Sequence, residues 1–249
     1  MDSESGTKTT IFEGRRALVI GGTGGIGRAV ALGLAERGAL VGVHGGFSRE
    51  RLEGTLQAIA KAGGKGIGFL CPVEETGAAE RVLAHFPEPD ILVCSWGPFR
   101  QGALEDLDGE FWQKITLGNL VFPGTIISLA IRGMMKKNYG RILLFGGTNT
   151  DTIRGFTTTA AYSAAKTALG VVAKSAARTG AKQGVTCNVI CPGLTDTEYL
   201  DETARSYNRE RSPCGRALET ADIACTALGI LENPGINGAV VSVDQGVVL

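Results

Sequence analysis

The sequence alternates short apolar runs with longer amphipathic stretches along most of its length. The apolar runs have the length of strands, and the stretches between them have the length and periodicity of helices. Strands that are apolar on both faces and separated by helices predict a parallel sheet that helices cover on both sides. We therefore expect a single α/β domain with a doubly wound parallel sheet of about seven strands. Ligands of such sheets bind beyond the carboxyl ends of the strands, where the strand order reverses.

The alternation divides the chain into predicted elements. The predicted strands cover residues 16–21, 40–44, 66–71, 90–95, 141–146, 185–191 and 239–244. The predicted helices cover residues 26–37, 49–62, 76–86, 110–137 and 221–232, and one more contains Tyr162 and ends near 183. The polar start of the chain predicts a disordered tail at 1–13, followed by the domain at 14–249. The charged stretch at about 195–215 predicts a lid over the substrate, because loops of this length are commonly lids.

The composition excludes several classes of function. The chain has 249 residues with 25 basic and 25 acidic side chains, so it lacks the basic excess of a nucleic-acid-binding protein. No uninterrupted apolar run is long enough to cross a bilayer, and the N-terminus lacks an apolar signal core. The six cysteines are scattered without the spacing of a metal site and are expected to be reduced thiols. We therefore expect a cytoplasmic protein without a nucleic-acid partner, a membrane partner or a bound metal.

A glycine-rich turn directly follows the first predicted strand. The run GGTGGIGRAVALGLA starts at Gly21 and opens the first predicted helix. Gly21, Gly25 and Gly27 stand where the chain must turn tightly, let a pyrophosphate approach the backbone and pack the helix against the strand. The helix N-terminus offers free amide groups and a positive dipole to phosphates. These glycines could instead serve only close packing, but their place in the first strand–helix turn favours dinucleotide binding.

Tyr162 and Lys166 form a second candidate site. The surrounding run AAYSAAKTALG is rich in helix-forming alanine, so both residues are expected on one helix. Residues four apart share a helix face, which lets the tyrosine hydroxyl and the lysine ammonium point into one site. A cation about 4 Å away would lower the pKa of a tyrosine from ~10 toward ~7, which suits an acid at neutral pH. The pair alone would also fit a solvated, charge-rich helix face.

Taken together, these motifs resemble the short-chain dehydrogenase/reductase family. The resemblance rests on the glycine pattern of GGTGGIG, Asn119 in the long predicted helix, the Tyr162-xxx-Lys166 pair and the run PGLTDT at 192–197. It extends from about Arg15 to the C-terminus through SPCGRALETADIA at 212–224 and NGAVVSVDQG at 237–246. The resemblance implies a Rossmann-type fold that binds a nicotinamide dinucleotide.

The resemblance also implies a role for each matching residue. Tyr162 would be the general acid/base for the substrate oxygen, and Lys166 would lower its pKa while binding the nicotinamide ribose. Asn119 would anchor a water of the proton relay. The last run, PGLTDT, matches the segment that holds the nicotinamide carboxamide. The implied cofactor-binding residues besides Tyr162 and Lys166 are Gly21, Thr23, Gly25, Ile26, Gly27, Val73, Gly97, Pro192, Gly193 and Thr197.

The chain departs from the family pattern in the loop after the fifth predicted strand. The family has a serine there whose hydroxyl holds the substrate carbonyl, but this chain reads FGGTNT at 145–150. Counting from the strand leads to Gly147, and counting back from Tyr162 leads to Asn149. We expect Thr148 to supply the substitute hydroxyl, with Asn149 as the second candidate, because either side chain can donate to a carbonyl oxygen.

Two further departures concern the cofactor. The family's Asn-Asn-Ala-Gly after the fourth strand is CSWG at 94–97 here, so only Gly97 is kept and Trp96 either contacts the cofactor or serves in packing. The aspartate that commonly reads the adenine is Pro72, which leaves backbone contacts from Cys71 and Val73.

The end of the second predicted strand decides the expected cofactor. It carries no carboxylate for the ribose 2′-hydroxyl, which argues against NAD. Arg49 could reach a 2′-phosphate, with help from His44 or Ser48, although Arg49 could equally be a solvated residue in the first turn of the next helix. We therefore expect NADP rather than NAD.

The sequence thus predicts an NADP-dependent reductase or dehydrogenase for a ketone/secondary-alcohol pair, with a small molecule or a 3-oxoacyl thioester as substrate. The competing hypothesis, motivated by the altered loops, is a dinucleotide-binding sensor or scaffold without catalysis. Arg205, Arg209 and Arg211 in the lid could bind an acidic substrate or a carrier protein, or form a solvated face. The family usually forms tetramers through its long helix and the Tyr162 helix, where small residues such as Ala164 favour close contact. We therefore expect a homotetramer.

Overall fold

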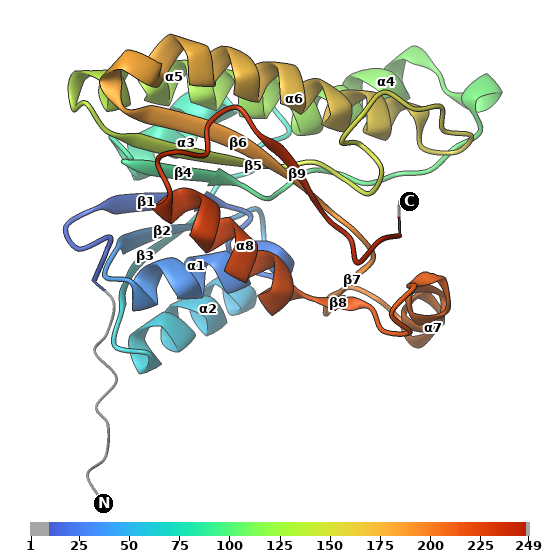
Figure 1. Ribbon diagram of the computed structural model, residues 1–249, viewed down its shortest axis with the longest axis horizontal. Helices are drawn as coiled ribbons and strands as arrows, with labels where there is room; N and C mark the ends of the chain where they lie inside the picture. The colour runs from blue at the N-terminus through green and yellow to red at the C-terminus, as the bar shows by residue number, and fades with distance from the viewer. Residues whose placement is uncertain (1–9, 248–249) are drawn as a thin grey trace, which may run out of the picture.

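The computed structural model describes residues 10–247. Its centre is a seven-stranded sheet with the order β3-β2-β1-β4-β5-β6-β9 (Figure 1). All six strand pairs are parallel, so the predicted doubly wound sheet is confirmed. The strands are β1 Arg16–Ile20, β2 Leu40–Gly45, β3 Lys65–Leu70, β4 Ile91–Cys94, β5 Gly140–Phe145, β6 Val185–Pro192 and β9 Val240–Val243.

Helices cover both faces of this sheet (Figure 1). One face carries α1 Gly25–Glu36, α2 Arg49–Lys61 and α8 Thr220–Glu232. The other face carries α3 Ala78–His85, α4 Gly109–Thr116, α5 Phe122–Lys136 and α6 Ala160–Gly180. The neighbouring β1 residues Leu18 and Val19 belong to different apolar cores, one beneath each helical layer. This explains why the strands are apolar at consecutive positions rather than at alternate ones.

The strand order reverses at β1. The chain runs from β1 outward to β2 and β3, and then returns to β4 on the other side of β1. The loops that follow β1 and β4 therefore diverge at the carboxyl edge of the sheet and leave a crevice between them. This crevice holds the candidate site.

The stretch predicted as one helix at 110–137 contains an irregular turn. A π-helical turn, Leu117–Val121, separates α4 from α5. Pro123 has no N–H for the helical ladder, and the side-chain amide of Asn119 donates to the Ile115 carbonyl at 3.0 Å in competition with the backbone. Turns of this kind occur often at functional sites.

The same stretch, Gly109–Lys136, is long and apolar enough to cross a membrane, judged by its length and composition alone. Its most apolar window of 18 residues has a mean hydropathy of 1.5, and 50% of that window is buried inside the protein. Ile126 and Met134 of α5 lie fully buried in the core. Packing against the sheet therefore accounts for the apolar character of this stretch.

The predicted lid has internal structure that the sequence pattern did not reveal. A two-residue strand, β7 Thr195–Asp196, pairs with β8 Leu218–Glu219. The helix α7 Glu202–Arg211 comes between them in the chain and lies beside the pair (Figure 1). At the other end of the chain, Phe12 is 2% exposed and belongs to the core, although it was predicted to lie in a disordered tail. Residues 1–9 of that predicted tail lie outside the described residues. The remaining predicted helices and strands are present, with ends that differ by a few residues.

Candidate active site

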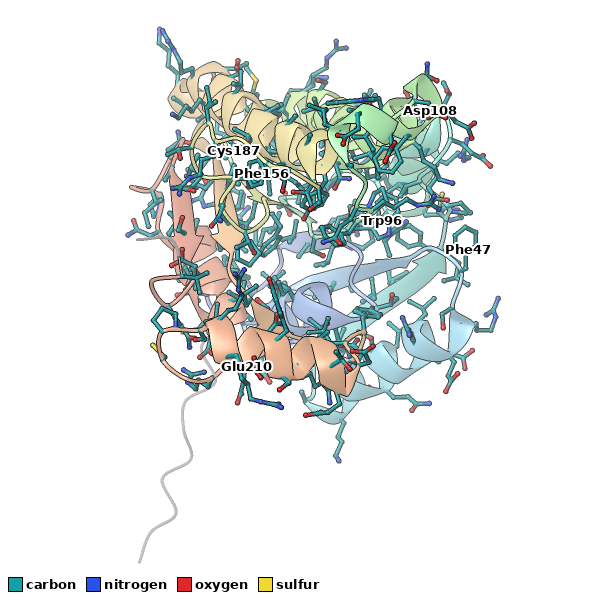
Figure 2. All side chains as sticks on the ribbon, turned by 90° about the vertical axis from the view of Figure 1, so that its right-hand side faces the viewer. Phe47, Trp96, Asp108, Phe156, Cys187 and Glu210 are labelled. Carbon is teal, nitrogen blue, oxygen red and sulfur yellow. The ribbon has the colours of Figure 1, made fainter. Side chains whose placement is uncertain are left out.

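The candidate site occupies the crevice between the glycine-rich loop after β1 and the loop after β4. Figure 2 looks onto this edge of the sheet, with Trp96 near the middle, between the two helical layers. The predicted cofactor-binding residues that line the crevice are Gly21, Thr23, Gly25, Ile26, Gly27, Gly97 and Thr197. Arg51 and Tyr199, to which the sequence did not point, line it as well.

The glycine-rich loop turns tightly and presents a backbone N–H at the N-terminus of α1. Gly21 has a φ of 76°, and a Cβ atom there would lie 2.8 Å from the Cβ of Trp96. At the N-terminus of α1, the Gly25 N–H donates to a carboxylate oxygen of Glu198 at 2.9 Å. This carboxylate oxygen stands where a phosphate oxygen would accept the same bond. The loop therefore fits an anionic group such as the pyrophosphate of a dinucleotide.

His44 joins the glycine-rich loop to the neighbouring strands. Its Nε2 lies 2.7 Å from the Cys71 carbonyl oxygen, and its Nδ1 lies 3.2 Å from the backbone nitrogen of Gly21. A carbonyl oxygen only accepts, so Nε2 carries the proton and Nδ1 accepts from the Gly21 N–H. Burial lowers the pKa of His44 to about 4. The neutral ring is thus engaged on both nitrogens, and it does not help to bind a 2′-phosphate as the sequence had led us to expect.

Arg49 and Arg51 both lie on α2 but have different surroundings. The side chain of Arg49 is 78% exposed, forms an ion pair with Glu53 at 4.0 Å and does not line the crevice. Arg51 lines the crevice, and its guanidinium carbon lies 4.7 Å from the centroid of the Tyr199 ring. Ser48 caps α2 by accepting from the Arg51 N–H at 3.3 Å. Of the two arginines, Arg51 therefore lies in the crevice, whereas the sequence had pointed to Arg49.

Tyr162 and Lys166 lie one turn apart on α6. The ammonium nitrogen of Lys166 is 5.8 Å from the centroid of the Tyr162 ring and donates to the Phe145 carbonyl at 2.8 Å. Burial lowers the pKa of Lys166 to about 8, so the side chain remains mostly charged at neutral pH. Phe99 packs edge-on against the Tyr162 ring, with the ring centroids 5.0 Å apart.

The pKa of Tyr162 differs from the expectation. Burial raises it to about 12, whereas the proximity of Lys166 was expected to lower it. The enclosed ring loses the water that would hydrate a phenolate, and Lys166 is hydrogen-bonded to the Phe145 carbonyl, so desolvation dominates. The residue as a whole is half-buried. Tyr162 thus keeps its proton across the neutral range, which suits a group that donates a proton to a substrate oxygen.

Asn119 lies in the π-helical turn and is fully buried. Its side-chain nitrogen donates to the Pro98 carbonyl at 2.8 Å, but its side-chain oxygen has no hydrogen-bond partner among the described residues. A Cβ atom on Gly97 would collide with this oxygen and lie 3.1 Å from the Lys166 ammonium nitrogen. Because Gly97 has no Cβ, the unpartnered oxygen and the ammonium border one small space. A water in that space could bond to both, as the relay role of Asn119 requires.

The loop after β5 places a glycine, rather than a hydroxyl, beside Tyr162. A Cβ atom on Gly147 would lie 2.9 Å from the Tyr162 hydroxyl, so the tyrosine occupies the room that a side chain would need. Thr148 donates its hydroxyl proton to the Pro192 carbonyl at 3.1 Å. A hydroxyl has only one proton, so Thr148 has none left for a substrate carbonyl in this arrangement.

Asn149 is the residue of this loop that keeps unused hydrogen-bonding capacity. It has a φ of 64°, in the left-handed region, and its buried side-chain oxygen has no partner. The neighbouring Thr150 hydroxyl both accepts from the Gly147 N–H and donates to the Gly147 carbonyl, at 2.8 and 2.9 Å. An unpaired buried polar group of this kind is typical of a functional site.

Val73, Pro192 and Gly193 do not line the crevice. Val73 is 3% exposed. Gly193 packs closely on the last strand of the sheet, since its N–H donates to the Val243 carbonyl at 2.9 Å.

The three lid arginines are paired with neighbouring side chains. The pairs are Arg205 with Asp196 at 3.0 Å, Arg209 with Glu202 at 2.7 Å, and Arg211 with the hydroxyl of Tyr207 at 2.8 Å. This pairing supports a solvated lid face rather than a free anion site.

Sequence comparison identifies relatives along almost the whole chain. Residues 21–248 match the family described as enoyl-(acyl carrier protein) reductase. The 3-oxoacyl-[acyl-carrier-protein] reductase FabG of Escherichia coli is 36% identical over 221 residues, which cover 86% of this chain and 88% of that protein. The 3-oxoacyl-[acyl-carrier-protein] reductase MabA of Mycobacterium avium is 31% identical over 244 residues, with 94% and 90% covered.

Solved structures share the fold. A short-chain dehydrogenase/reductase from Serratia marcescens superposes with a TM-score of 0.86 at 29% identity, covering 96% of this chain and 99% of that one. The angucycline C-6 ketoreductase LanV, solved with bound NADP, also gives a TM-score of 0.86, at 26% identity and with 95% and 96% covered.

Proposed function

This chain belongs to the short-chain dehydrogenase/reductase family, and on that basis we propose that it reduces a 3-oxoacyl thioester with NADPH. The chain is an oxidoreductase that transfers hydride between a nicotinamide and a ketone/secondary-alcohol pair. The proposal depends most on one arrangement. Tyr162, Lys166 and Asn119 lie close together, and the glycine-rich loop donates a backbone N–H, that of Gly25, to an anionic group. The idea of a sensor or scaffold without catalysis receives no support from this site.

The residues present fit a nicotinamide dinucleotide phosphate. The α1 N-terminus at Gly25 would hold the pyrophosphate, Lys166 the nicotinamide ribose and Thr197 the carboxamide. Arg51 would hold the 2′-phosphate, because a guanidinium forms charge-assisted, often bidentate, bonds with phosphate. The bound cofactor supplies the hydride. The NADP bound in the similar ketoreductase LanV also supports NADP over NAD.

Tyr162 would act as the acid of the reduction. Its raised pKa, about 12, means that the proton is present when a carbonyl oxygen gains negative charge. Lys166, still mostly charged at neutral pH, would stabilise the phenolate that remains after the proton has left. The buried oxygen of Asn119 would hold a water that returns a proton through Lys166.

Asn149 would take the place of the family serine. Its amide can donate to the substrate carbonyl, while Thr148 is bound to the Pro192 carbonyl and Gly147 carries no side chain. Such a donor is aimed at the oxygen on which charge develops, so it stabilises the transition state more than the bound ketone.

An acyl thioester is the substrate class that we propose. The relatives FabG and MabA are named for the reduction of 3-oxoacyl groups on acyl carrier protein. In this chain Phe99, 58% exposed, stands against Tyr162. An apolar ring beside the proposed acid suits an acyl chain. We further propose that the protein is cytoplasmic and homotetrameric.

Cofactor titration followed by a substrate assay tests the proposal. Nicotinamide fluorescence would report the binding of NADPH and NADH to the wild type, Arg51→Ala and Arg49→Ala. We expect tighter binding of NADPH, and Arg51→Ala should reduce its advantage over NADH roughly tenfold, as expected for the loss of a charged hydrogen bond. Arg49→Ala is the matched control and should change little.

The substrate assay uses an acetoacetyl thioester and the Tyr162→Phe variant. We expect turnover by the wild type and a loss of roughly 1000-fold in Tyr162→Phe with NADPH affinity retained. Preference for NADH would refute the cofactor assignment alone. NADPH binding without reduction of any oxoacyl thioester or simple diketone would refute the proposed activity.

A further inference from the structure

The segment that follows β7 lies across the glycine-rich loop. Glu198 in this segment accepts the Gly25 N–H at 2.9 Å, at the N-terminus of α1. A dinucleotide pyrophosphate at this helix N-terminus would accept the same Gly25 N–H. In the described chain the Glu198 carboxylate already accepts it. A negative charge at this position also repels an incoming phosphate.

Tyr199 covers the adjacent part of the loop. Its hydroxyl lies so close to Gly24 that a Cβ atom on Gly24 would overlap it, and a Cβ atom on Gly25 would lie 3.4 Å from the tyrosine ring. The backbone that a pyrophosphate must approach is therefore in contact with a phenol ring. Tyr199 is 54% exposed, so no core packing holds it in this place.

Arg51 connects this segment to α2 on the other side of the crevice. Its guanidinium carbon lies 4.7 Å from the centroid of the Tyr199 ring, a distance typical of a cation–π contact. Both groups line the crevice. The arginine proposed for the 2′-phosphate is thus occupied by the tyrosine.

We propose that Glu198 and Tyr199 form an internal plug that competes with the dinucleotide for the phosphate-binding loop. The plug is held by two contacts, one from Glu198 to Gly25 and one from Tyr199 to Arg51. The dinucleotide must displace both contacts, and the 2′-phosphate of NADP(H) replaces Tyr199 as the partner of Arg51. This inference rests on the proposed function only for the identity of the dinucleotide.

The plug has a measurable consequence for affinity. If only a fraction of the molecules has the loop open, the observed dissociation constant is the intrinsic constant divided by that fraction. Weakening either contact raises the open fraction and tightens binding. A residue that simply binds the dinucleotide would have the opposite effect when it is removed.

The test is the titration of NADPH and NADH against Glu198→Gln and Tyr199→Ala. Each variant should bind both dinucleotides roughly three to ten times more tightly than the wild type, because Glu198→Gln removes the charge from one contact and Tyr199→Ala removes the other contact. Glu202→Gln and Tyr207→Ala are matched controls. They remove a glutamate and a tyrosine that pair with arginines within α7, away from the crevice lining, and should leave affinity unchanged.

Arg51→Ala provides a second, independent readout. It removes one contact of the plug together with the 2′-phosphate partner, so NADH should bind more tightly while NADPH binds more weakly. Circular dichroism and melting temperature establish that each variant is folded.

The possible failures are distinguishable. If neither dinucleotide binds to the wild type or to any variant, the proposed function fails. If NADPH binds but Glu198→Gln and Tyr199→Ala bind it equally or more weakly, the plug is refuted and the enzyme assignment stands.

Discussion

At the scale of single residues, the candidate site has a glycine at one of the two positions where a serine side chain was expected. Gly147 stands beside Tyr162, and the tyrosine hydroxyl fills the room that a Cβ atom would take. The hydrogen-bond donor for the substrate must therefore come from elsewhere in the loop. Thr148 is turned toward the Pro192 carbonyl, so the donor that we propose is the side-chain NH2 group of Asn149.

The first prediction compares two substitutions in this loop. Asn149→Ala should lower the turnover of the acetoacetyl thioester roughly 100-fold, because it removes a donor to the developing oxyanion. Thr148→Val should lower turnover much less, because that hydroxyl is bound to a backbone carbonyl. Steady-state kinetics and NADPH titration separate the loss of turnover from a loss of cofactor affinity. The reverse ranking of the two variants would assign the donor to Thr148.

At the scale of elements, one buried side chain ties three strands together at the site. His44, next to the last residue of β2, accepts from the loop after β1 and donates to Cys71 just after β3. The parallel strands place these three chain segments side by side, so one imidazole can bridge them. The neutral ring is required, because a protonated Nδ1 could not accept the Gly21 N–H.

The second prediction follows from the lowered pKa of His44. The folded state has a pKa of about 4 at this residue and the unfolded state about 6.5, so between these values the unfolded chain binds more protons. Acid therefore favours unfolding, and His44 should remove about 3 kcal/mol of unfolding free energy as the pH falls from 7 toward 4. Urea unfolding at several pH values measures this loss.

The control for this prediction is His44→Gln, whose side chain does not titrate. The variant starts from a lower stability at pH 7 because the bridge is altered, but its stability should fall less between pH 7 and pH 4. The carboxylates contribute equally to both proteins, so the difference between the two slopes reports His44. Parallel curves would mean that the ring is not held neutral in the folded protein.

At the scale of the whole molecule, an apolar groove lies on the outer face of the layer formed by α5 and α6. Its apolar lining includes Ile127, Ile131, Met135, Val171 and Val172, and Val171 is 68% exposed. An exposed apolar groove of this kind marks an interaction site more often than a solvated surface. A second copy of the chain could cover it, as expected for a homotetramer assembled through these helices.

The third prediction is that Val171→Asp breaks this assembly. The wild type should sediment as a tetramer, and the variant as a dimer or monomer, because a carboxylate in an apolar interface loses its hydration without a partner. Ile67→Asp, at a 45% exposed position on the edge strand β3, is the control and should remain tetrameric. Sedimentation velocity distinguishes these states. A monomeric wild type would refute the expected assembly.

Much of the architecture could be predicted from local sequence. The strands and helices are recognisable because burial on both faces of the sheet imposes consecutive apolar residues, and burial on one face of a helix imposes its own period. Tyr162 and Lys166 could be paired because four residues of one helix fix their relation, whatever the rest of the chain does. The glycine pattern after β1 likewise reports a local turn.

Other features depend on contacts between segments that are distant in the sequence. The pKa of Tyr162 is set by what encloses its ring, so the sequence argument from Lys166 alone had the wrong direction. Arg49 and Arg51 are two residues apart, and only the packing of α2 decides which of them reaches the crevice. The bond between Gly25 and Glu198 joins residues 173 positions apart. The sequence by itself thus determined the elements, the parallel sheet and the placement of Tyr162 beside Lys166, because short-range geometry encodes them. Protonation, hydrogen-bond partners and the occupant of the phosphate loop were decided only by the tertiary structure, because they depend on which distant groups it brings within contact.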